Sequence, residues 1–262
     1  MNRNRALTVT VVTIMRTLME KGTDTGMDTA TKSFAIGSGG TGAMQLLRLL
    51  QLASPTLPVG AYAYSQGMEH AIDRQWLSDA ESTQEWIIGV MQHNMVYVDL
   101  PVFGRLYTAL LDDQGEVFEY WNLYLLASRE SRELQNEDLH LGNALLQLLA
   151  DLEMESASAR IDQPMSFAAA FALASVHWNI DLGDAAAALL WSWADNQVAA
   201  AIKLVPLGQT AGQRILVKCM EQIPRAIQQA LSLEDEAIGF SSPALAIGSA
   251  HHEMQYSRLF RS

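Results

Sequence analysis

The sequence predicts an all-α fold, in which about nine or ten helices form a single bundle-like domain. Apolar residues recur at helical spacing along most of the chain, as in the run from Leu46 to Leu52. Helix-capping and turn residues separate these runs. An alternating pattern typical of a β-strand is found only at Thr8–Ile14, so a sheet is not expected.

Residues 1–43 differ in character from the rest of the chain. A short apolar run, Leu7–Met15, is followed directly by Arg16 without a small-residue cleavage pattern, which argues against a signal peptide. Gly37–Gly42 has the composition of a linker. We therefore expect residues 1–43 to be a disordered N-terminal extension and residues 44–262 to form the helical domain.

The first helix of this domain should end at Ser54, because Pro55 disfavours the α conformation of the residue before it. A rigid turn follows, in which Pro58 fixes φ and Gly60 permits conformations that a Cβ atom would forbid. A second helix is expected over Ala61–Ile72.

Ser78 and Glu81 form a capping-box pattern that predicts a helix reaching about Val98, which Pro101 should interrupt. Ser166 is a suitable N-cap. The further predicted helices are Val102–Leu111, Glu116–Gln135, Asp138–Leu152, Phe167–Trp178, Ala185–Leu204, Thr210–Gln222 and Pro224–Leu231.

The chain is acidic, with a formal net charge of −12 over 262 residues. Residues 1–43 hold five Lys/Arg and three Asp/Glu, so the remainder holds 12 basic and 26 acidic residues and carries −14. Such a surface argues against a nucleic-acid partner. The most apolar window, Ala185–Val205, contains Asp195 and Lys203, which favours a buried helix over a membrane span. Cys219 is the only cysteine, which excludes an internal disulfide and fits a reducing cytoplasm.

Motifs of the common catalytic sites are missing from the sequence. There is no GxSxG elbow, no phosphate-binding GxxxxGK[ST] loop and no HExxH. Among the six histidines the only cluster is His251-His252-Glu253, and Glu69-His70 is a weaker second locus. Neighbouring residues of a helix point about 100° apart, so these are weak candidates for a metal site.

Two further regions are notable. Lys203 lies near the C-terminus of an apolar helix, where a cation stabilises the helix dipole. Tyr256, Arg258, Phe260 and Arg261 crowd into a terminal segment that would otherwise fray, and these are residue types that anchor interfaces. We favour an interface for this segment.

Five stretches of the sequence resemble one known family. They are Leu49–Ser54 (LLQLAS), Leu57–Gly60 (LPVG), Tyr64–Glu69 (YSQGME), Lys203–Gln209 (KLVPLGQ) and Gln255–Ser262 (QYSRLFRS). Together they resemble the urease accessory protein family UreF. The resemblance runs from about Met44 to the last residue. Because the five stretches occur in the family's order over some two hundred residues, they are far more specific together than any one motif.

The resemblance implies a cytoplasmic, non-catalytic accessory protein for nickel insertion into urease. Such a protein would bind the accessory protein UreD, also called UreH, and recruit the GTPase UreG on the urease apoprotein. Nickel and GTP would be handled by the complex, with no cofactor intrinsic to this chain. The family also implies a homodimer, and no membrane or nucleic-acid partner is expected.

The same resemblance suggests roles for individual residues. Tyr62, Tyr64, Ser65 and Glu69 would line or brace a partner-facing surface beside the Pro58–Gly60 turn. Lys203 would lie in a region facing UreG or urease. Four residues of the terminal segment would become ordered on binding UreD: Tyr256, Arg258, Phe260 and Arg261. The chain departs from the family in residues 1–43 and mildly at Ala61.

Three alternatives remain open from the sequence. The chain could be a nickel-binding metallochaperone that uses His251, His252 and Glu253. It could activate the GTPase by supplying Arg258 or Arg261 in trans. It could also be an α-helical enzyme whose site lacks a familiar motif.

Overall fold

The computed structural model describes residues 42–239 and 242–262, which form helices and turns and contain no β-strand. Helix α4, the π-helical segment η3 and helix α5 follow one another without a break, so these ranges hold ten separate helices. The predicted all-α fold is confirmed for this part of the chain. The expected N-terminal extension lies outside the described residues, apart from Gly42 and Ala43.

The first half contains α2 (Ala43–Ala53), the 3-10 turn η2 (Ala61–Ala63), α3 (Met68–Asp73), α4 (Ala80–Val90), η3 (Met91–Asp99), α5 (Leu100–Leu111) and α6 (Gly115–Ala127). The second half contains α7 (Arg132–Asp151), α8 (Glu155–Ser158), α9 (Phe167–His177), α10 (Leu182–Leu204), α11 (Gln209–Leu231), the 3-10 turn η4 (Asp235–Ala237) and α12 (Pro243–His252).

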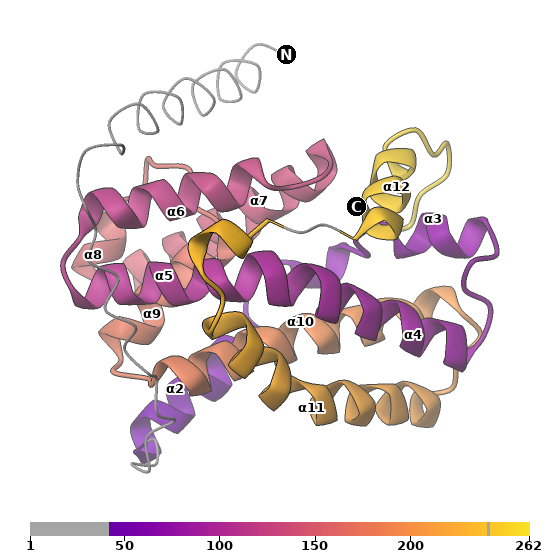
Figure 1. Ribbon diagram of the computed structural model, residues 1–262, viewed down its shortest axis with the longest axis horizontal. Coiled ribbons are helices and arrows are strands. Elements are labelled where there is room, and N and C mark those ends of the chain that lie inside the picture. The colour runs from indigo at the N-terminus through magenta and orange to yellow at the C-terminus, as the bar shows by residue number, and fades with distance from the viewer. Residues whose placement is uncertain (1–41, 240–241) are drawn as a thin grey trace.

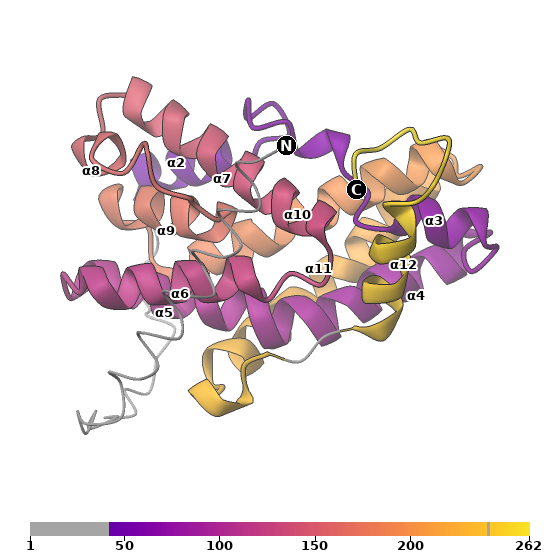
Figure 2. The ribbon, with the colours of Figure 1, turned by 90° about the horizontal axis from the view of Figure 1, so that it is seen from above.

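The continuous α4–η3–α5 helix crosses the whole molecule (Figure 1). Its α5 half packs against α6 and α9, and α10 and α11 lie along each other beside it. At the end of the molecule where α4 lies, α12 packs against α3 (Figure 2). Phe103 of α5 and Phe171 of α9 are fully buried with ring centroids 6.1 Å apart. Burying such a ring contributes about 1.5–3 kcal/mol, so this contact contributes clearly to the stability of the core.

Neither of the two prolines expected to separate helices does so. The chain runs through Pro101 because the π-helical segment η3 precedes it, and Pro101 stands at the start of α5. Pro101 removes one backbone N–H from this continuous helix, and the buried residues of η3 and α5 keep the helix in place. Pro224 lies inside α11, which continues to Leu231. Packing of the buried face of α11, including Ile223 and Ile227, outweighs the lost hydrogen bond.

Two segments that were expected to form single helices are each divided into two, because a glycine or a capping side chain starts a new helix within them. The predicted helix over Ala61–Ile72 is a short 3-10 turn, an extended stretch and then α3, which begins after Gly67. The predicted helix over Glu116–Gln135 ends at Ala127. A new helix, α7, starts after Ser131, whose hydroxyl accepts from the Leu134 amide at 3.2 Å.

Other boundaries agree more closely with the prediction. Ser166 caps α9, as predicted, and α10 ends at Leu204, as predicted. The capping box of α4 forms between Asp79 and Ser82, one position later than predicted. None of the helices in the described ranges is long and apolar enough to cross a membrane.

Candidate functional site

The stretch between α2 and α3 contains two glycines with positive φ, Gly60 at 80° and Gly67 at 76°. Gly67 is also a point of close approach, because a Cβ atom there would lie 2.7 Å from the backbone nitrogen of Ser249 in α12. Glycine is therefore required at position 67 for two reasons. Its small size brings α12, and the chain that follows it, against the start of α3.

We call residues 253–262 the tail; it folds back over this stretch. The Arg261 amide donates to the carbonyl of Ala63 at 2.9 Å. The amide and hydroxyl of Ser65 both donate to the carbonyl of Ser262, at 2.8 and 2.7 Å. Ser65 and Ser262 are fully buried. The tail is thus docked on its own chain through backbone hydrogen bonds.

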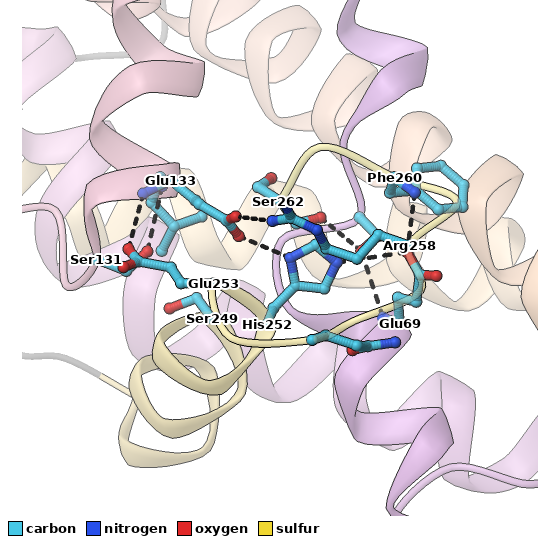
Figure 3. A network of polar contacts seen from close by, with 12 residues as sticks. Glu69, Ser131, Glu133, Ser249, His252, Glu253, Arg258, Phe260 and Ser262 are labelled. Carbon is cyan, nitrogen blue, oxygen red and sulfur yellow. Dashed lines mark hydrogen bonds and ion pairs between the residues drawn. The ribbon is translucent and has the colours of Figure 1, made fainter. Parts of the chain in front are cut away.

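Glu69, at the start of α3, holds the tail by its carboxylate (Figure 3). Its two oxygens accept hydrogen bonds from the amides of Leu259 and Phe260, at 2.7 and 2.8 Å. Bonds to an ionised acceptor are stronger than those between neutral groups. The Phe260 ring is buried, and the Lys203 ammonium lies 5.7 Å from its centroid, within cation–π range.

Glu133, in the first turn of α7, joins α12 and the tail (Figure 3). Its carboxylate lies 2.6 Å from Nδ1 of His252, and it also accepts from the guanidinium of Arg258. The other ring nitrogen of His252 is 3.4 Å from Glu69. The Glu133 amide donates to Glu253 at 3.1 Å. Three separate segments therefore meet around the fully buried ring of His252.

Glu137 lies one helical turn after Glu133 and is buried. It accepts from the Ser262 hydroxyl at 2.5 Å and from the Gln66 amide at 2.8 Å. Gln66 in turn accepts from the indole of Trp193 at 2.8 Å. Burial raises the pKa of Glu137 to about 7, although the bonds from Ser262 and Gln66 act in the opposite direction. This carboxyl group therefore changes its charge near neutral pH.

A second buried charge cluster includes Asp138, the residue that follows Glu137 in α7. The guanidinium of Arg129 contacts Asp99 at 2.7 Å and Asp138 at 2.8 Å. Asp138 also accepts from the Phe167 amide at 2.7 Å, at the start of α9. Burial alone would lower the pKa of Arg129, but the charges of Asp138 and Asp99 outweigh it and raise this pKa well above its ordinary value. Arg129 is a fixed cation that ties three helical segments together.

The residues expected to bind a partner fall into an exposed and a buried group. Tyr62 is 65% exposed and Tyr256 is fully exposed; the side chains of Arg258 and Arg261 also reach the surface. The buried group consists of Tyr64, Ser65 and Phe260, with Glu69 largely covered. The exposed group is open to contact with a partner, which stays a prediction, whereas Ser65 and Glu69 hold the tail by hydrogen bonds.

Several residues of this network were missed by the sequence analysis. They are Gln66, Glu133, Glu137 and Trp193. Glu133 and Glu137 share one helix face, and a pair of acids at that spacing was the available signal. The pattern was obscured because the sequence suggested a helix end at Gln135, between them.

The weak metal candidates do not converge on one point. The exposed ring of His251 stacks on His70, with centroids 5.2 Å apart. His252 is enclosed by carboxylates, and Glu253 binds a backbone amide. Burial, followed by the charge of Arg74, lowers the pKa of His70. Within the described ranges, no group of three or more His, Cys, Asp or Glu is placed to hold a metal ion.

Comparison with known proteins gives a consistent result. The model of the UreF family matches residues 77–220. The urease accessory protein UreF of Alkalilimnicola ehrlichii is 48% identical over 82% of this chain and 95% of its own length. UreF of Teredinibacter turnerae is 49% identical over 83% of this chain and 99% of its own length. UreF of Hahella chejuensis is 44% identical over 84% of this chain and 99% of its own length.

Proposed function

Because the chain belongs to the urease accessory protein family UreF, we propose that it is a non-catalytic scaffold in urease maturation. In this role it binds UreD (UreH), recruits the GTPase UreG and docks with them on the urease apoprotein for nickel insertion. The chain acts in the cytoplasm as a homodimer within that complex. Nickel and GTP are handled by the assembly, with no cofactor held by this chain.

The docked tail is the observation that supports this proposal. Tyr256 is fully exposed, and Met254 and Leu259 are 85% and 67% exposed on the same short segment. Exposed aromatic and apolar side chains on an ordered backbone are typical of binding hot spots, since little conformational entropy is lost on association. The network around Glu69 and Glu133 supplies that order.

The charge of the segment also suits a partner. Lys203, Arg258 and Arg261 lie on or beside the tail, whereas the chain as a whole carries −12. Exposed basic side chains on an acidic protein can orient an acidic partner surface during encounter. In our proposal Tyr62, Tyr256, Arg258 and Arg261 face UreD. Lys203 lies towards UreG or urease.

The buried predicted residues have a supporting role in this proposal. Tyr64, Ser65, Glu69 and Phe260 hold the tail in the shape that the partner binds. The tail is already docked on its own chain when no partner is bound. UreD would therefore bind a surface that is largely formed beforehand, and the tail would not have to become ordered on binding.

Co-purification of the chain with UreD and UreG tests this function. We expect Tyr256→Ser to weaken recovery of UreD strongly, and removal of residues 253–262 to abolish the ternary complex. Leu111→Ser is the control, because Leu111 is 60% exposed at the end of α5 and lies outside the tail network. Full recovery of the complex with both tail variants would refute the proposal.

A role in activating the GTPase is the second candidate. Arg258 is engaged with Glu133, whereas Arg261 is exposed at its side chain and anchored through its backbone amide. That arrangement makes Arg261 the better candidate for an arginine supplied in trans. A large rise in GTP turnover by UreG on adding the chain, lost in Arg261→Ala and kept in Arg258→Ala, would support it.

A further inference from the structure

The outer face of helix α2 is apolar and is not covered by any other part of the described ranges. α2 packs against α10, and its residues Leu52 and Ala53 are buried. Four large apolar side chains of the same helix are between 48% and 65% exposed: Met44, Leu46, Leu47 and Leu50. Because successive helical residues point about 100° apart, these four lie on one side of α2. We call them the α2 face.

The α2 face is separate from the tail and carries no charge of its own. α2 lies at one edge of the molecule, apart from α12 and the tail (Figure 1 and Figure 2). Its only charged residue is Arg48, whose guanidinium lies 4.8 Å from the centroid of the Trp178 ring and donates to Gln51. Single exposed leucines are ordinary, but adjacent apolar side chains on one helix mark an interaction site. The α2 face therefore suits an apolar, uncharged occupant.

The size of the α2 face favours an occupant from the same chain over a second copy of the protein. A stable interface between two proteins takes about 20–30 residues from each side, whereas the α2 face has four. A tethered segment needs fewer contacts, because a short tether raises its local concentration to about the millimolar range.

Residues 1–41 contain a segment of the required character. Leu7–Met15 reads LTVTVVTIM and holds no charged residue. Residues 16–41, which are 26 residues, connect it to the described part of the chain. A flexible chain of that length spans about 25–30 Å on average, and a helix of 11 residues such as α2 is about 16 Å long. Leu7–Met15 is therefore tethered within reach of the whole α2 face.

We propose that the α2 face is a docking site for Leu7–Met15 of the same chain. The docked segment covers the α2 face with its Val and Ile side chains, which removes both apolar surfaces from water. For this segment the proposal replaces the sequence-based expectation of disorder. It involves no other protein and therefore does not rest on the proposed function. A partner that uses the α2 face would have to displace the segment first.

Disulfide trapping in the full chain tests the docking. Cys219, the only native cysteine, is buried, so two introduced thiols react with each other. We expect Val11→Cys combined with Leu47→Cys to form a disulfide within one chain. The matched control is Val11→Cys combined with Ile247→Cys, because Ile247 is 49% exposed but lies in α12. The control should react at least about tenfold more slowly, since only a docked segment holds the two thiols at high local concentration.

Two results of this experiment would overturn the proposal. One is an equal rate of disulfide formation in the two pairs. The other is a disulfide-linked dimer of Leu47→Cys alone that forms as fast as the bond within one chain, which would assign the α2 face to a second copy.

Hydrogen exchange on the full chain gives a second measurement and leaves the helical body unaltered. Val11→Asp combined with Ile14→Asp places two charges in the segment and should release it, because a charge is costly against an apolar surface. The amides of α2 should then exchange several-fold faster than in the wild type. Thr23→Asp combined with Thr25→Asp adds the same charges outside the segment and should change nothing. Unchanged exchange in α2 after the first pair of substitutions would likewise refute the docking.

Discussion

The hydroxyl of Ser262 lies 2.5 Å from the carboxyl group of Glu137, although 125 positions separate the two residues in the sequence. This contact fastens the tail to α7 at a buried group whose charge changes near neutral pH. The docking of the tail and the ionisation of Glu137 are therefore linked.

The first prediction concerns the pH dependence of stability. The folded chain raises the pKa of Glu137 from 4.5 to about 7, so between these values the folded state retains a proton that the unfolded state releases. The free energy of unfolding should therefore fall as the pH rises through this range, by up to about 1.4 kcal/mol per pH unit. Glu137→Gln, which stays neutral, should lack this part of the slope.

Urea denaturation at several pH values measures this slope. Glu221→Gln, at an exposed position paired with Lys218, is the matched control and should retain the wild-type dependence. An unchanged slope in Glu137→Gln would contradict the assignment.

The second prediction concerns the hold of Glu69 on the tail. Glu69→Gln removes the negative charge and one of the two oxygens that accept from Leu259 and Phe260. Hydrogen bonds to charged groups contribute about 1.5–3 kcal/mol, so exchange of these two amides should accelerate by about tenfold or more. Hydrogen-exchange measurements on the full chain test this, with exposed Glu85→Gln as the control. Identical protection in both variants would show that Glu69 does not hold the tail.

The third prediction separates two reasons for glycine. Gly60 and Gly67 share a positive φ, but open space surrounds a Cβ atom only at Gly60. Gly60→Ala should lose about 1 kcal/mol from the conformational strain alone. Gly67→Ala should lose clearly more, because its methyl group would overlap the backbone of Ser249. Chemical denaturation compares them, and equal losses would argue against the close contact of α3 and α12.

The fourth prediction concerns the buried cation. Arg129→Met would leave Asp99 and Asp138 without their partner and should cost about 3–5 kcal/mol of unfolding free energy. Arg105→Met, which breaks the pair with the exposed carboxylate of Asp235, should cost about 1 kcal/mol or less. A loss for Arg129→Met as small as that for Arg105→Met would mean that water already screens the cluster.

The class of fold and most helix positions could be predicted from periodicity and capping residues. The helix after Ser166 and the end of the helix at Leu204 were predicted correctly because their signals are local. Pro101 and Pro224 were misleading because packing of the long helices outweighs the local cost of proline. Such packing is a property of the whole fold and is invisible in a window of sequence.

The partner-binding role of the candidate site residues stays a prediction. Tyr62 and Tyr256 were proposed from residue type and from the family resemblance, and both side chains are exposed in the structure. The bracing carboxyl groups of Glu133 and Glu137 were not identified, since their partners His252 and Ser262 are more than a hundred positions away. Long-range polar pairing leaves no regular pattern in a single sequence.

The distance in sequence between Glu69 and the amides that it binds has a consequence for biosynthesis. A ribosome adds Leu259 some 190 residues after Glu69, so the carboxylates of Glu69 and Glu133 stay hydrated while most of the helices are already made. The nascent helical body can collapse early, but the tail can dock on Glu69 and Glu133 only once translation has passed α12. Premature release of the chain would thus yield a compact product without the docked tail, in which the carboxylates of Glu69 and Glu133 remain exposed to water.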